Sequence, residues 1–125
     1  MATERRSLDR RAAAFTQITP FGLNGAFRLA RKYGVAVRFV DFGAWSEGEL
    51  RAEYDPSVPE IVVNRRIAES LVDAERDRFV QHAVGHELYH HREYIGEIAR
   101  LPTKSAREAA ADAYATQLLK YGESS

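Results

Sequence analysis

Residues 79–95 read FVQHAVGHELYHHREYI, and the spacing of apolar residues in this stretch decides how the fold is interpreted. The apolar side chains recur at intervals of four or seven positions, which places them on one face of an α-helix. This apolar stripe consists of Val80, Val84, Leu88 and Ile95. We therefore expect a long helix from Asp73 to about Tyr94 that packs on the protein core along the stripe.

The chain before this helix predicts one further helix and a small sheet. Thr19 and Pro20 are typical of a helix start, and Gly34 is a natural stop after Tyr33. Three later runs are rich in β-branched and aromatic residues, which favours strands. These runs cover residues 35–41, 50–54 and 61–64. Because their connections are short, we expect the strands to pair mainly antiparallel.

The chain after the third run predicts helices. A short helix is expected over residues 66–71, before the long one. Pro102 interrupts the pattern, and a final helix then runs from about Ser105 to Lys120, where Gly122 follows as a stop. The expected fold class is α+β: a small, about three-stranded, mainly antiparallel sheet with an N-terminal helix, a long helix and a C-terminal helix.

The composition is that of an ordinary globular protein. Among 125 residues, 18 basic side chains balance 18 acidic ones, so direct binding of nucleic acid is not expected. No apolar run has the length of a membrane span. Residues 1–18, which include several arginines, are expected to form a basic, flexible arm. Residues 19–122 are expected to form a single domain. The absence of cysteine excludes disulfides and thiolate ligands, and it is compatible with a cytoplasmic protein.

His86, Glu87 and His90 form the pattern with the clearest chemical meaning. Two histidines four positions apart lie one helical turn apart, so both rings project from the same face and can reach one ion. Glu87 lies beside them, where its carboxylate can contact a water near that ion. Nitrogen and oxygen ligands with one open coordination position are typical of catalytic zinc. The pattern therefore predicts one zinc ion per chain.

Two further histidines flank this pattern. His82 lies one turn before His86 and is an alternative ligand, although three ligands along one helix would crowd one side of the ion. His91 points about 100° away from His90 around the helix axis. We expect His91 to be solvated or packed at the rim of the site.

The final helix offers a third ligand. Glu108 and Asp112 lie one turn apart on a stripe of otherwise apolar residues, where acids are unexpected unless a positive charge faces them. We expect Glu108 to bind the metal. Asp112 would then accept a hydrogen bond from the far ring nitrogen of His86 or His90.

Two alternatives to this assignment stay open. Glu93 and Glu97 are also acidic, but they continue the helix of the two histidines and would have to bend back along it. Ser105 and Glu108 also fit a capping box, in which Glu108 would bind the backbone of Ser105 and no metal.

Residues around both halves of this metal motif resemble a known protein family. They are His86-Glu87-Leu88, His90, Glu108, Ala111-Asp112, Tyr114-Ala115 and Leu118-Leu119, with Leu29-Ala30-Arg31, Gly34-Val35, Val37 and Ile61-Val62-Val63-Asn64 upstream. In these residues the chain resembles the ImmA/IrrE metallopeptidases, over roughly residues 21 to 120. The Glu-x-x-x-Asp element is also similar to that of gluzincin proteases generally.

This resemblance implies a zinc-dependent endopeptidase. Relatives in the family cut a partner transcriptional repressor, commonly a helix-turn-helix protein, so the expected partner is a separate protein substrate. Carried over by position, His86, His90 and Glu108 would be the metal ligands and Glu87 the general base.

Three features depart from the family pattern. Tyr89 stands where the family often has glycine, and Gly85 stands where alanine is common. Lys120 and Tyr121 follow the paired leucines, where the family often has Met-Pro. None of these differences removes a catalytic group, but Tyr89 adds bulk near the site.

The predicted reaction is hydrolysis of a peptide bond. Zinc would activate water and polarise the carbonyl group, while Glu87 would take the proton and pass it to the leaving amine. A second donor to the oxyanion is expected, and Tyr94 and Tyr54 are the candidates. The alternative function is a zinc-stabilised, non-catalytic binding module that sequesters a repressor or toxin partner. Glu87 favours the enzyme, because a purely structural site would not need it.

Overall fold

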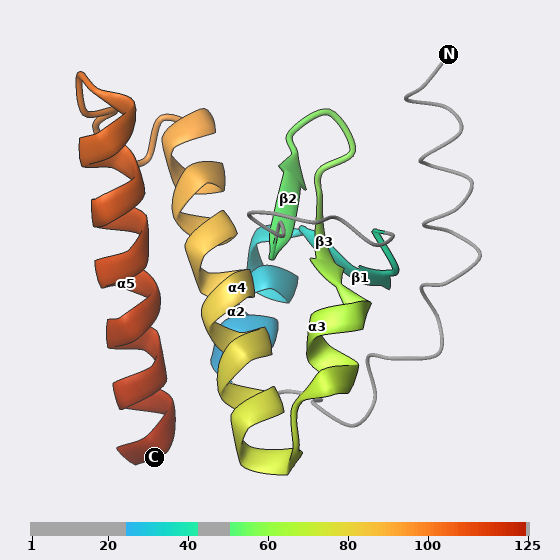
Figure 1. Ribbon diagram of the computed structural model, residues 1–125. Helices are drawn as coiled ribbons and strands as arrows, with labels where there is room; N and C mark the ends of the chain where they lie inside the picture. The colour runs from blue at the N-terminus through green and yellow to red at the C-terminus, as the bar shows by residue number, and fades with distance from the viewer. Residues whose placement is uncertain (1–24, 43–50, 125) are drawn as a thin grey trace.

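The computed structural model describes residues 25–42 and 51–124, which form four helices and three strands (Figure 1). The fold is of the α+β class, as expected. In chain order the elements are α2 (Gly25–Tyr33), β1 (Ala36–Val40), β2 (Ala52–Asp55), β3 (Glu60–Asn64), α3 (Arg65–Ser70), α4 (Asp73–Tyr94) and α5 (Lys104–Ser124). The expected arm over residues 1–18, the helix start at Thr19 and Pro20, and Leu50 lie outside the described residues.

The sheet is mixed, so the expectation of mainly antiparallel pairing is wrong. Its strand order is β1-β3-β2, with β3 antiparallel to β2 but parallel to β1. Ile61 in the central strand is the register partner of Val37 on one side and of Tyr54 on the other. The prediction failed because it paired strands that are neighbours in sequence. The chain from β1 to β3 contains all of β2, which makes the connection long enough for a parallel pair.

Local signals set the ends of the shorter helices. Gly34 adopts a φ of +73°, a left-handed conformation that favours glycine, and so ends α2. Asn64 closes β3 and also caps α3, because its side-chain oxygen accepts a hydrogen bond from the Arg66 amide at 3.0 Å. These two residues turn the chain directly from helix to strand and from strand to helix.

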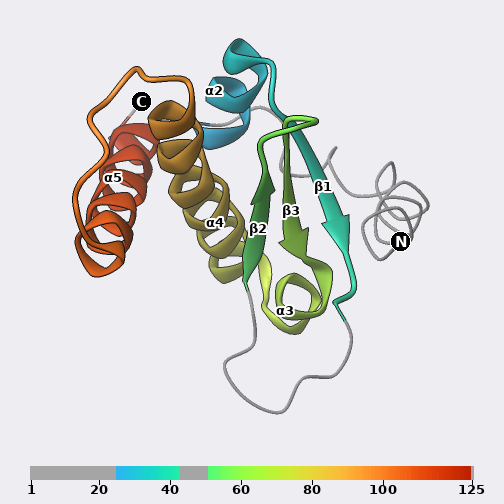
Figure 2. The same cartoon turned by 90° about the horizontal axis from the view of Figure 1, so that it is seen from above.

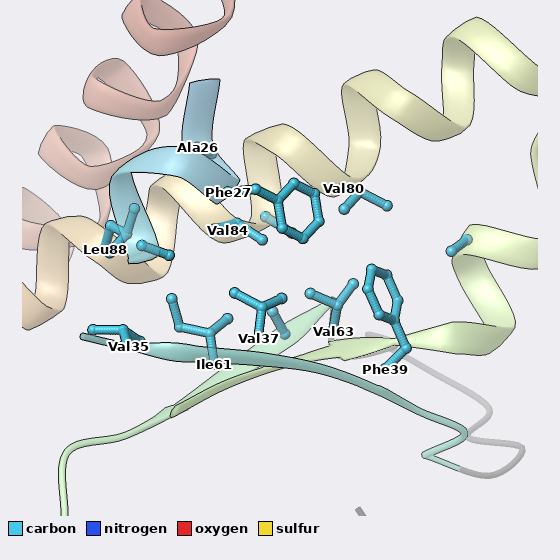
Figure 3. Packing of buried hydrophobic residues seen from close by; sticks show 14 residues of the cluster. Ala26, Phe27, Val35, Val37, Phe39, Ile61, Val63, Val80, Val84 and Leu88 are labelled. Atoms are coloured by element: carbon cyan, nitrogen blue, oxygen red, sulfur yellow. The ribbon is translucent and has the colours of Figure 1, made fainter. Parts of the chain in front are cut away.

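The core lies between the sheet and the helices α2 and α4 (Figure 3). Val80, Val84 and Leu88 are fully buried, which confirms the apolar stripe of α4 over most of its length. Ile95 is 48% exposed, so its place in the stripe was predicted wrongly. The reason is that α4 ends at Tyr94, and the chain leaves the helix axis before Ile95 can pack.

Helix α4 lies between the sheet and α5, so that α5 covers the face of α4 that the sheet leaves free (Figure 2). Gly85 allows this close approach. A Cβ atom at this position would lie 3.1 Å from Leu118 Cδ1 and 3.2 Å from Ala115 Cα. Ala111 and Ala115 are fully buried in the same contact. Small residues on both helices thus bring the first turns of α5 beside the end of α4.

Helix α5 is longer than expected at both ends. It begins at Lys104, because the Thr103 hydroxyl accepts a hydrogen bond from the Ala106 amide and so caps the helix. It also continues through Gly122 to Ser124, so Gly122 does not act as the expected stop. None of the helices formed by the described residues combines the length and apolar character of a membrane span.

Candidate metal centre

His86, His90 and Glu108 meet where α4 and α5 pack side by side (Figure 1). Glu108 Oε1 lies 2.9 Å from Nε2 of His86, and Oε2 of the same carboxylate lies 3.0 Å from Nε2 of His90. Each of the three residues offers one possible ligand atom, and these three atoms lie within 4.8 Å of one another. In the described part of the chain, these three residues are the group that could hold a metal ion.

A carboxylate orients each of the two imidazole rings from the far side. Asp112 Oδ1 lies 2.7 Å from Nδ1 of His86, and Glu93 Oε1 lies 2.9 Å from Nδ1 of His90. Both contacts are made by Nδ1, so Nε2 of each ring faces Glu108, as in a metal-binding imidazole that a carboxylate orients. Asp112 was expected to bind the far ring nitrogen of His86 or His90, and in the structure it contacts that of His86. Sequence reasoning missed Glu93 in this role, although its position three residues after His90 on a helix was a usable signal.

The burial of His90 Nε2 fits a metal ligand. This atom is buried and has no hydrogen-bond partner, because its 3.0 Å contact with Glu108 Oε2 lacks hydrogen-bond geometry. Buried polar atoms without a partner are rare, and a role in metal binding is one explanation for them. An imidazole nitrogen and a carboxylate oxygen on either side of a cation would both be satisfied. The donor set of two imidazoles and one carboxylate suits zinc and related divalent ions.

Glu87 lies beside this group in a desolvated position. Burial, together with the negative charges of Glu108 and Glu53, raises the pKa of Glu87 to about 7, against the opposing effect of His86. Burial alone would lower the pKa of His86, but the charge of Glu87 and the hydrogen bonds to Asp112 and Glu108 outweigh it and raise that pKa. A carboxyl group poised near neutrality is suited to accept and return a proton.

A pocket of about 340 Å³ opens beside the metal group. Its lining residues are Tyr54, Glu87, His90, Glu93, Tyr94, Arg100, Lys104, Arg107 and Glu108. Both candidate oxyanion donors thus border the pocket, but they differ in exposure. Tyr94 is 64% exposed, whereas Tyr54 is partly buried and its hydroxyl lies 2.6 Å from Nδ1 of His91. Burial, followed by the nearby Tyr94 and Asp55, raises the pKa of Tyr54 to about 12, so its hydroxyl stays protonated.

His91 is only 5% exposed, so of the two expectations for this residue, solvated or packed, it is packed. The cause is a neighbouring pair of tyrosines. The rings of Tyr33 and Tyr54 pack edge-on against the imidazole, with centroid distances of 5.7 and 5.6 Å. Desolvation lowers the pKa of His91, which favours the neutral ring.

The alternatives to Glu108 as third ligand lie elsewhere. His82 is half-buried and outside the metal group, and desolvation lowers its pKa. Glu97 binds Tyr33 and Arg92 rather than the two histidines. The capping box is also wrong, because Ser105 lies inside α5 and Thr103 holds the cap position.

Comparisons with protein-family models, with curated proteins and with solved structures return no match to this chain. The resemblance to the ImmA/IrrE metallopeptidases therefore stays a prediction from the motif residues.

Proposed function

We propose that this chain is a zinc-dependent endopeptidase that hydrolyses a peptide bond in a protein partner. The convergence of His86, His90 and Glu108 beside Glu87 carries the proposal. Following the family resemblance, we propose a helix-turn-helix transcriptional repressor as the partner and the cytoplasm as the compartment.

The proposed division of roles follows from the contacts. His86, His90 and Glu108 would hold the ion, and Asp112 and Glu93 would keep the two rings turned toward it. Zinc bound there would act as a Lewis acid and make water a stronger acid. Glu87 would accept the proton of the attacking water and pass it to the leaving amine. Tyr54, protonated at neutral pH, would donate to the oxygen on which negative charge develops.

A non-catalytic zinc module is the competing proposal, and a fourth protein ligand would favour it. The candidates for that ligand are Asp112 and His82. Asp112 contacts the far nitrogen of His86, and His82 lies outside the metal group. Three ligands from the described residues and a pocket beside them support the enzyme.

The test compares zinc-loaded wild type with Glu87→Gln on a library of proteome-derived peptides, with new chain ends identified by mass spectrometry. Wild type should produce cuts that a chelator abolishes. The variant should keep its zinc and lose about two to four orders of magnitude in rate, the usual contribution of a general base. Equal cutting by both proteins would exclude Glu87 as the base, and no cutting by either would favour the binding module.

A further inference from the structure

Three cationic side chains line the pocket. Arg100 lies in the connection between α4 and α5, Lys104 is the first residue of α5, and Arg107 lies in its first turn. We call these three residues the cationic edge. The Arg107 guanidinium donates a hydrogen bond to the Leu101 carbonyl at 3.1 Å, which ties the connection to the helix. The edge is therefore attached to the same helix that supplies Glu108.

Two of these three cations, Arg100 and Lys104, have no partner within the described residues. Arg100 and Lys104 are exposed, and neither forms an ion pair or hydrogen bond with another described side chain. Two carboxylates that line the pocket contact histidines instead, since Glu93 contacts His90 and Glu108 contacts both ligand histidines. Arg100 and Lys104 are thus available to an external anion.

The charge balance of the pocket favours such an anion. Three carboxylates, those of Glu87, Glu93 and Glu108, line the same pocket as the three side chains of the cationic edge. A divalent ion held by the metal group would therefore leave the pocket with a net positive charge of about two. Two cations left unpaired by the described residues suit a single carboxylate group rather than the continuous phosphate chain of a nucleic acid.

We propose that Arg100 and Lys104 bind a carboxylate of the peptide substrate, next to the bond that is cut. The inference rests on the proposed function, because the pocket adjoins the proposed metal. The carboxylate belongs to an aspartate or glutamate side chain or, if the enzyme cuts at a chain end rather than within the chain, to the substrate's own C-terminus. Arginine binds either one through two parallel hydrogen bonds, and lysine adds a point charge.

The experiment is a titration with three pentaglycine-based peptides. Binding is monitored through the backbone amide chemical shifts of the non-proline residues in the range 100–108. The first peptide is blocked at both ends and has aspartate at its centre. The second has asparagine there, and the third is pentaglycine with a free C-terminal carboxylate. The protein is Glu87→Gln, so that no probe is cut, and it is titrated both zinc-loaded and metal-free. The two carboxylate peptides separate the two sources of the anion.

We expect at least one carboxylate peptide to bind about five-fold more tightly than the asparagine peptide, as two exposed ion pairs would give. Adding Arg100→Gln and Lys104→Gln should abolish this preference. Adding Arg31→Gln and Lys32→Gln should keep it, because that pair removes the same charge from the exposed end of α2.

Two results would overturn the inference. One is equal binding of all three peptides, and the other is a preference that survives loss of Arg100 and Lys104, which would assign the carboxylate to the metal. A short single-stranded oligonucleotide is titrated as well. If it binds more tightly than the peptides, through Arg100 and Lys104, the ligand of these two residues is a nucleic acid and not a peptide. None of these outcomes depends on hydrolysis. The carboxylate site can therefore fail its test while the proposed peptidase stands, and the peptidase can fail its own test while the carboxylate site stands.

Discussion

Glu93 Oε1 lies 2.9 Å from Nδ1 of His90, one turn earlier on the same helix. The Glu93 side chain is only 7% exposed, and its second oxygen, Oε2, is buried without a hydrogen-bond partner. A carboxylate in such surroundings is unfavourable unless positive charge lies nearby. A divalent ion on the opposite side of the His90 ring would supply that charge through the imidazole. The burial of Glu93 thus links the end of α4 to the proposed metal.

Replacement of Glu93 by glutamine should weaken zinc binding. Glutamine keeps the shape of the side chain but removes the charge that makes His90 a stronger ligand, so we expect about a ten-fold loss of affinity. Competition with a chromophoric chelator measures this loss. Glu75→Gln, an exposed change in the first turn of the same helix, is the control and should leave affinity unchanged. If Glu93→Gln binds zinc as tightly as wild type, Glu93 does not orient His90 for metal binding.

Gly85→Ala tests the close packing of α4 on α5. The added methyl group would meet the Ala115 backbone at 3.2 Å, which a change of rotamer cannot relieve. Overpacking of this kind lowers stability by about 1–3 kcal/mol, against a gain of about 1 kcal/mol from the better helix former. Urea unfolding should therefore show a net loss of up to about 2 kcal/mol. An increase in stability would show that the helices have room to separate.

The sequence predicted the parts of the site that follow from helical periodicity. Val80, Val84 and Leu88 identified the buried face of α4, and this fixed where its histidines point. The prediction of Glu108 and Asp112 assumed that both acids lie on a buried, apolar face, yet their side chains are 46% and 60% exposed. The spacing of residues on a helix was enough to place both acids beside His86.

The sequence could not predict features that depend on which elements become neighbours. The parallel pairing of β1 with β3 requires knowing that β2 lies at the opposite edge of the sheet. The burial of His91 depends on Tyr33 and Tyr54, which come from α2 and β2 and meet its ring only in the folded chain. Helical periodicity describes one helix at a time, so it left open whether His91 is solvated or packed.

Tyr54→Phe tests the proposed oxyanion donor. Loss of one such donor lowers kcat about 10²–10³-fold in well-studied hydrolases, and zinc content should not change. Tyr94→Phe is the matched control, since Tyr94 borders the same pocket but is mostly exposed, and we expect nearly wild-type activity. Full activity of Tyr54→Phe on any peptide that wild type cuts would contradict the assignment.

Glu97 predicts a pH dependence of stability. Hydrogen bonds from Tyr33 and then Arg92 lower the pKa of Glu97 below its ordinary value of 4.5. A carboxylate with a lowered pKa stabilises the fold above that ordinary value, and the contribution is lost as pH falls through the folded-state pKa. The metal-free wild type should therefore be slightly more stable than Glu97→Gln at pH 7, and the difference should shrink as pH falls below 4.5 and vanish once the carboxyl group is protonated in both states. A difference that stays constant over this range would show that the charge of Glu97 does not contribute.

The most direct test of the central claim is the zinc content of the purified protein and of Glu108→Ala, measured by elemental mass spectrometry after equilibration with zinc and removal of the excess. The account predicts about one zinc ion per wild-type chain, the stoichiometry of a single three-ligand site, and a marked loss in Glu108→Ala. A wild-type protein that retains no zinc, or a variant that retains as much as wild type, would contradict it.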